Sequence, residues 1–100
     1  MLWAISRVAA PNFAALRETG LQVHLDYLKS QKGILVLSGA TLTNDGRDYV
    51  GSLLIVNVNS RAEARAFVDG DPFQKAGMFT NVTITRMRKG QWNPQAAEGA

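Results

Sequence analysis

The chain's single histidine, His24, is the residue best suited to proton chemistry. A histidine side chain titrates at about pH 6.5 when unperturbed, so it can accept and release protons near neutrality. The 100 residues include no cysteine, no glycine-rich phosphate loop and no run of metal-ligating residues. Any catalysis by this chain is therefore predicted to depend on His24 as a general acid or base.

The segment Asp71-Pro72-Phe73 offers a partner for His24. Aspartate followed by proline is typical of a helix start, with Asp71 as N-cap and Pro72 in the first turn. A carboxylate has about four acceptor positions, so Asp71 could also fix the imidazole tautomer and stabilise an imidazolium. Two interpretations stay open: a catalytic His24–Asp71 dyad, or a capping aspartate beside a histidine that lies at the core edge and bonds a carbonyl.

Four further side chains could contribute to a substrate pocket. Arg17 lies seven residues before His24, so on a continuous helix both share a face, and Arg17 could receive an anionic group or simply be solvated. Tyr27 and Ser38 could donate hydrogen bonds, and Phe73 could form a pocket wall. One histidine among scattered carboxylates does not predict a metal site, and no cofactor is expected.

Hydrophobic periodicity predicts the elements that position these residues. Leu21, Leu25 and Leu28 mark one face of a first helix, whose early turns Gly20 predicts to be irregular. Asp45-Gly46 indicates a hairpin, and Ser60 with Glu63 forms a capping box. The predicted order is a strand at 2–8, a helix from 13 ending at Gly33, a strand from 34, a strand at 49–58, a helix from 60 to Gly70, a short turn or helix to Gly77, and a strand at 79–87.

This β-α-β-β-α-β order predicts an α+β fold, a ferredoxin-like sandwich with a four-stranded antiparallel sheet. The helices should cover one face of the sheet. The other face is also apolar, because residues of both parities in the middle strands are aliphatic, as Leu53 and Leu54 illustrate. An exposed apolar face predicts a homodimer packed through the open sheet.

Composition sets the remaining bounds. The chain is 46% apolar and 19% charged, with a net charge of +3, which fits a single folded domain. We expect this domain at 1–89 and a flexible polar tail at 90–100. Trp92 is the one residue of the tail that could dock on the domain. The modest, dispersed charge argues against nucleic-acid binding. No apolar run reaches the roughly 20 residues of a membrane span, and the N-terminus does not resemble a signal peptide, so a cytoplasmic location is expected.

Several segments together resemble the YCII-related (YciI-like) family of dimeric α+β-barrel proteins across residues 1–89. They are His24-Leu25-Asp26-Tyr27-Leu28, Leu37-Ser38-Gly39-Ala40, Gly51-Ser52-Leu53-Leu54, Glu63-Ala64-Arg65-Ala66-Phe67, Asp71-Pro72-Phe73 and Lys75-Ala76-Gly77. The resemblance implies a sheet-mediated dimer and a cleft in which His24 and Asp71 carry the family's histidine and aspartate roles. Chemistry assigned in the family includes dehydrochlorination of a chlorinated hydroxyquinol. Family members often have Gly-Pro where this chain has Gly39-Ala40, a departure that could reshape the pocket wall.

Two functions follow as hypotheses. The first is a cofactor-independent lyase- or isomerase-type enzyme in which His24 moves a proton on a small polar or anionic ring substrate while Asp71 orients it. The second is a non-catalytic module that binds a small ligand or partner, with His24 as hydrogen-bond donor or pH sensor. A His24–Asp71 hydrogen bond beside a solvent-connected pocket would favour the first hypothesis.

Overall fold

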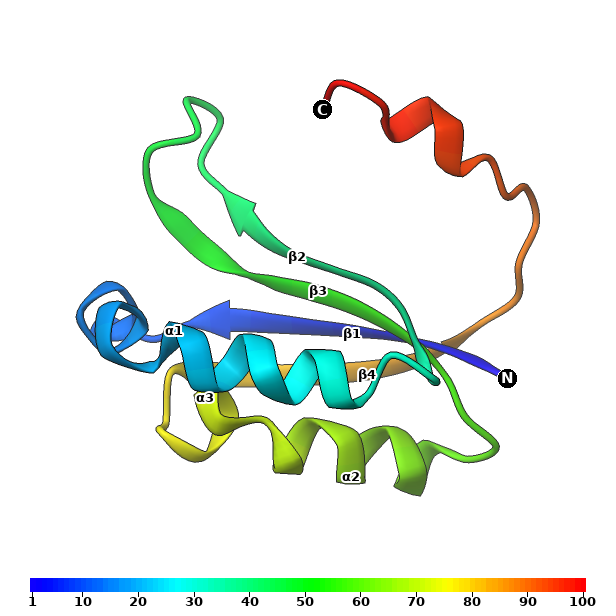
Figure 1. Cartoon of the computed structure of the whole chain (residues 1–100), viewed down its shortest axis with the longest axis horizontal. Helices are drawn as coiled ribbons and strands as arrows, with labels where there is room; N and C mark the ends of the chain where they lie inside the picture. Colours follow the sequence, from blue (N-terminus) through cyan, green and yellow to red (C-terminus); the bar gives the residue numbers. More distant parts are fainter.

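The computed structural model describes all residues, 1–100, and has the predicted order of elements (Figure 1). A short helix after Asp71 and a 3-10 turn in the tail complete it. The elements are β1 (Leu2–Ala9), α1 (Phe13–Ser30), β2 (Leu35–Leu42), β3 (Tyr49–Asn57), α2 (Arg61–Gly70), α3 (Pro72–Lys75), β4 (Phe79–Met87) and η1 (Pro94–Ala97).

The four strands form one antiparallel sheet in the order β2-β3-β1-β4, and the helices lie on one of its faces (Figure 1). This is the predicted ferredoxin-like arrangement. Paired residues share a face, so the register gives the two surfaces directly. Two rows of partners face the helices: Ser38, Leu54, Ile5 and Ile84, and next to them Ala40, Ser52, Arg7 and Val82.

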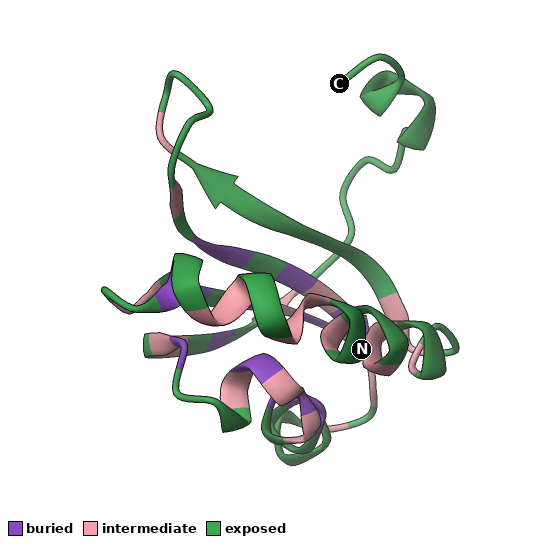
Figure 2. Cartoon of the chain, turned by 60° about the vertical axis from the view of Figure 1, so that its left-hand side comes forward, coloured by how far each residue is buried: buried purple, intermediate pink, exposed green.

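The core fills the space between this face and the helices (Figure 2). Ile5 and Val56 of the sheet and Val68 of α2 are completely buried. A smaller aromatic cluster around Phe13 and Phe73 closes the end of the sandwich where α1 begins. That end also contains the only buried charged side chains, Arg7 and Asp71, so the apolar core ends where the polar residues gather.

Helix α1 differs from its prediction in three respects. It continues through Gly20 without a break and ends at Ser30, before Gly33. A Cβ at Gly20 would lie 3.4 Å from Cε1 of Phe73, an ordinary van der Waals distance, so the helix packs directly against this aromatic ring at that point. The close packing offsets the roughly 1 kcal/mol that glycine costs in a helix. Leu25 is 43% exposed rather than part of the core face, because it borders an open cavity between α1 and the sheet.

The helix-start prediction for α2 is confirmed. The Ser60 hydroxyl accepts a hydrogen bond from the amide of Glu63 at 3.1 Å, and the Glu63 carboxylate accepts one from the amide of Asn59 at 2.6 Å. Both acceptors satisfy amides that have no partner within the helix. The capping box thereby fixes the direction in which α2 leaves β3.

The face of the sheet opposite the helices is uncovered; it is aliphatic along β2 and β3, while Ser6 of β1 and Thr83 and Thr85 of β4 make its other side more polar. Its exposed side chains include Val8, Val36, Leu37 and Leu53. Residues 88–100 leave the end of β4, and all of them are exposed (Figure 2). Trp92 is 56% exposed and does not dock in the domain core. No helix combines the length and the apolar character that crossing a bilayer requires.

Candidate active site

Asp71 begins helix α3, as predicted. Its backbone is extended, with φ −69° and ψ 123°, and its Oδ1 accepts a hydrogen bond from the Phe73 amide at 3.0 Å, while Pro72 occupies the first helical turn. The capping geometry holds the carboxylate in one orientation beneath α1. The side chain is 1% exposed, so this carboxylate must find its partners inside the protein.

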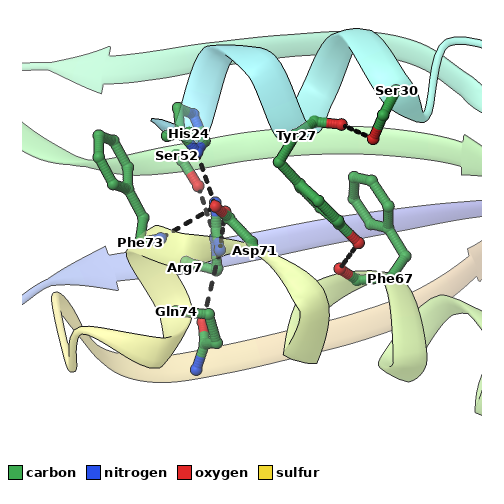
Figure 3. Close-up of polar contacts among 9 residues, drawn as sticks. All are labelled: Arg7, His24, Tyr27, Ser30, Ser52, Phe67, Asp71, Phe73 and Gln74. Atoms are coloured by element: carbon green, nitrogen blue, oxygen red, sulfur yellow. Dashed lines mark hydrogen bonds and ion pairs between the residues drawn. The ribbon is translucent and has the colours of Figure 1, made fainter. Parts of the chain in front are cut away.

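His24 provides the nearest of these partners (Figure 3). Its Nδ1 lies 2.7 Å from Oδ1 of Asp71, the same oxygen that caps α3. An ionised carboxylate only accepts hydrogen bonds, so Nδ1 carries the proton and donates it. In the neutral ring the lone pair is then on Nε2, which bonds to no group of the protein. The arrangement leaves one ring nitrogen anchored and the other free.

Phe73 fixes the plane of the imidazole. The two rings are parallel within 1°, and their centroids are 3.8 Å apart. Because Phe73 follows Asp71 by two residues in the capping turn, one short segment supplies both the hydrogen bond and the stacking surface. His24 thus loses rotational freedom about both side-chain torsions, which is the preorganisation that proton transfer requires.

Arg7 is a third member of the site that sequence reasoning missed. Its Nη1 lies 2.9 Å from Oδ2 of Asp71, its Nε donates to the Ser52 hydroxyl at 2.9 Å, and Nη1 also approaches Oε1 of Gln74 at 3.4 Å. The guanidinium carbon lies 3.9 Å from the centre of the Phe79 ring. Arg7 is 2% exposed, so this ion pair is a buried one and both charges depend on it.

These contacts set the charge state of the pair. Burial by itself raises the pKa of Asp71, but the hydrogen bond from His24, the charges of Arg7 and His24 and the Phe73 amide together hold that pKa below its usual range. Burial lowers the pKa of Arg7, and the neighbouring Asp71 opposes the change. Asp71 is therefore an anion at neutral pH and can stabilise a positive charge on His24.

A cavity of about 220 Å³ opens beside His24, between α1 and the sheet. Of the residues proposed from sequence, His24, Arg17, Ser38 and Phe73 line it. Asp71 lies behind His24 rather than in the wall. The other lining residues include Arg7 and Ser52 from the helix-facing rows, Phe13 and Phe79 from the aromatic cluster, and Leu21, Leu25, Leu28, Gly39, Ala40, Gly51 and Leu54.

Tyr27 is outside the cavity. Its hydroxyl donates to the Phe67 carbonyl of α2 at 2.7 Å, and burial raises its pKa. A Cβ at Gly70 would lie 2.5 Å from this hydroxyl, so the glycine makes room for it. Tyr27 therefore joins α1 to α2 and does not reach the pocket that the sequence interpretation assigned to it.

Arg17 lies at the cavity without an acidic partner. Because α1 is continuous, Arg17 and His24 share a face, as the seven-residue spacing predicts. Its guanidinium carbon lies 4.6 Å from the centre of the Tyr49 ring, and no carboxylate pairs with it. A cation held over an aromatic ring and otherwise free can attract an anionic group.

A simple signal could have revealed Arg7 and Ser52. In β1 the buried side chains Trp3 and Ile5 set a period of two that continues to Arg7. In β3 Val56 and Leu54 set the same period, which continues to Ser52. Polar residues on the buried face of two paired strands need partners, so their parity marks a polar site.

Known proteins agree with this architecture. A model of the YCII-related domain family matches residues 1–88. The chain is also similar to a solved structure of 5-chloro-2-hydroxyhydroquinone dehydrochlorinase (TftG) from Burkholderia phenoliruptrix AC1100 in complex with 2,5-dihydroxybenzoquinone. Sequence identity is 35%, the match covers 90% of this chain and 96% of the other, and the TM-score is 0.80. A comparison with curated proteins finds no match. By the extent of these matches, the chain belongs to the YCII-related family.

Proposed function

We propose that this protein is a cofactor-independent enzyme of lyase or isomerase type, with His24 as its general acid–base. The observation that carries the proposal is the state of the imidazole. Nδ1 is bound to Asp71 at 2.7 Å, and Nε2 has no partner in the protein. His24 itself lines the cavity. A base of this kind accepts a proton at Nε2, and the Asp71 anion stabilises the imidazolium that forms.

The similar dehydrochlorinase suggests the kind of reaction. Loss of hydrogen chloride removes one proton from a substrate and releases one chloride ion, so it needs a base and a place for the developing negative charge. His24 supplies the base. Arg17 supplies a free positive charge at the same cavity, which favours an anionic or strongly polar substrate. We propose a small hydroxylated or quinone-like ring compound as the substrate.

The size of the cavity is consistent with this choice. Sites for drug-sized ligands span roughly 300–1,000 Å³, and a cavity of about 220 Å³ suits a smaller molecule. Phe73 and Ser38 line it with one apolar and one hydrogen-bonding surface, as a hydroxylated ring would require.

A turnover assay with 5-chloro-2-hydroxyhydroquinone and a panel of related hydroxylated rings tests the proposal. The wild type should release a proton and a leaving group from at least one of them, and His24→Ala should lower the rate by about a hundredfold or more. Gln22→Ala, on the exposed side of the same helix, should retain the wild-type rate. Binding without turnover in the wild type would instead identify a ligand-binding module, and an active His24→Ala variant would reject the acid–base role.

We also propose that the protein forms a homodimer through the open face of the sheet. Val36, Leu37 and Leu53 are exposed there on adjacent strands, and contiguous apolar patches of this kind mark interaction surfaces. Residues 86–92 border a groove of about 900 Å³ on this face, so the start of the tail would lie at the edge of the interface. A twofold contact would bury the same residues on both protomers.

A further inference from the structure

Ser52 has a hydroxyl group with an unused donor. Its Oγ accepts the hydrogen bond from Nε of Arg7 at 2.9 Å, and Ser52 donates to no acceptor of the protein. The residue is 9% exposed and lines the cavity next to His24 (Figure 3). A hydroxyl can accept and donate at once, so its proton is free for a group that enters the cavity. Buried polar donors are normally hydrogen-bonded, so this one is available to an acceptor atom of a ligand or water in the cavity.

Arg7 makes this donor stronger than that of an ordinary serine. Hydrogen bonds polarise one another in series, and a cationic donor to Oγ draws electron density from the O–H bond. Arg7 and Ser52 face each other as paired residues on β1 and β3, so the sheet register sets their contact. The Phe79 ring covers the guanidinium and keeps it in place.

The same guanidinium holds the two sides of the site together. Its Nη1 lies beside Asp71, which anchors His24, and its Nε is bound to Ser52. Arg7 is therefore a positioning residue for both the base and the hydroxyl donor. When a proton leaves the substrate toward His24, negative charge develops on the substrate. The polarised Ser52 hydroxyl can then donate a hydrogen bond to the oxygen that carries this charge.

We propose that Ser52 is a catalytic residue that donates a hydrogen bond to the oxygen anion of a phenol-, enol- or quinone-type ligand, and that Arg7 acts through it. The inference rests on the proposed function and adds to it a named receptor for the negative oxygen. A donor aimed at developing charge in a water-poor cavity stabilises the ionised ligand and the transition state more than the neutral ligand. The pocket should accordingly prefer the anionic form of its ligand.

The test uses the full chain and 2,5-dihydroxybenzoquinone as the probe, with its visible spectrum recorded across pH in the free and bound states. Bound to the wild type, the probe should keep the spectrum of its ionised form to lower pH than in free solution. Ser52→Ala should weaken binding of the ionised form by about tenfold or more, and should move the ionisation midpoint back by about one pH unit. Ser52→Cys, with a weaker donor of similar size, should give an intermediate shift, and Ser30→Ala on the exposed end of α1 should give none.

The outcomes separate this inference from the proposed function. A Ser52→Ala variant that binds the ionised probe as the wild type does, while His24→Ala abolishes turnover, overturns the role of Ser52 alone. If the ionisation midpoint of the bound probe moves back in Ser52→Ala while His24→Ala remains active, the anion site is supported and the acid–base role is rejected. A wild type that binds neither the probe nor any ring of the panel overturns both. If Ser52→Ala fails to fold, the midpoint in Ser52→Cys decides the matter.

Discussion

Phe73 orients His24 directly through its ring and indirectly through Asp71. Its ring lies parallel to the imidazole at 3.8 Å between centroids, and its amide donates to the same Asp71 oxygen that accepts from His24 Nδ1. The orientation of the imidazole therefore depends on the first turn of α3, a helix of only four residues. Hydrogen bonding and stacking each restrict a different rotation of the ring, and together they determine where Nε2 lies.

The first prediction concerns the stacking surface. Phe73→Leu should lower kcat/KM by about ten- to a hundredfold, because the imidazole gains freedom to tilt away from its reactive orientation. The free energy of unfolding should fall by about 1–3 kcal/mol, since the ring is buried. Urea denaturation and steady-state kinetics measure the two effects.

Phe67→Leu is the matched control for this substitution. Phe67 is equally buried, but it packs in the other cluster against Tyr27 and does not line the cavity. We expect it to lose comparable stability while kcat/KM stays within about twofold. Equal losses of activity in both variants would show that stacking on His24 has no special role.

The second prediction concerns acid stability. The pKa of Asp71 in the folded protein lies below its unfolded value of about 3.8–3.9, so near that pH the unfolded state binds more protons. The stabilisation is therefore complete above the unfolded value and is lost as pH falls through the folded one. Urea denaturation of the wild type at pH 7 and at pH 3 should show this loss, and Asp71→Asn should lack that part of it.

Asp71→Asn should also be less stable at pH 7 by about 3–5 kcal/mol, because Arg7 is then buried without a counter-charge. Asp45 is the control for the pH effect, since its pKa is also lowered, by hydrogen bonds from the Thr43 hydroxyl and the Arg47 amide in an exposed turn. Asp45→Asn should leave most of the pH dependence in place. If the free energy of unfolding of Asp71→Asn falls between pH 7 and pH 3 as much as that of the wild type, Asp71 is not the source of the acid sensitivity.

The third prediction concerns the glycine beside Ser52. A Cβ at Gly51 would lie 2.0 Å from the Arg7 carbonyl oxygen, so Gly51→Ala should force β3 away from β1. We expect a loss of at least about 3 kcal/mol in the free energy of unfolding, measured by thermal and urea denaturation. Gly33→Ala, where a Cβ meets nothing within 4 Å, should change stability by less than about 1 kcal/mol. Similar stabilities for the two variants would refute the close approach.

The fourth prediction concerns the open face of the sheet. Sedimentation of the wild type should show a dimer, and Leu53→Lys should weaken its dimer dissociation constant by about a hundredfold or more, because a twofold interface buries two unpaired cations. Val23→Lys, on the exposed side of α1, should leave the assembly unchanged. A monomeric wild type at micromolar concentrations would be inconsistent with the proposed interface.

Periodicity and capping signals were enough to predict the order of elements and the position of Asp71 as a helix cap. Both depend on interactions within a few residues, which a sequence displays directly. The continuity of α1 through Gly20 could not be read this way, because the compensating contact comes from Phe73, 53 positions away. The bond from Tyr27 to the Phe67 carbonyl likewise depends on the packing of two helices.

The sequence predicted the helix-borne half of the site but not the half that comes from the sheet. Residue chemistry and family resemblance identified His24 and Asp71, but the pairing of Arg7 with Ser52 depends on strand order. Strands β1 and β3 are neighbours although α1 and β2 separate them in the chain. A polar residue at a buried parity indicates that a partner exists, but only the sheet register identifies that partner.

The polar site in the cavity forms only when β1 and β3 pair in their native register. Arg7 and Ser52 meet because β1 and β3 pair in one particular alignment. A slip by a single residue would turn each side chain of the displaced strand to the opposite surface, leaving a guanidinium among the aliphatic groups there and Asp71 with no counter-ion. Molecules with a shifted register would therefore lose both stability and the polar contacts that line the cavity. A ligand of this cavity would bind only molecules whose sheet has the native register, and would stabilise them.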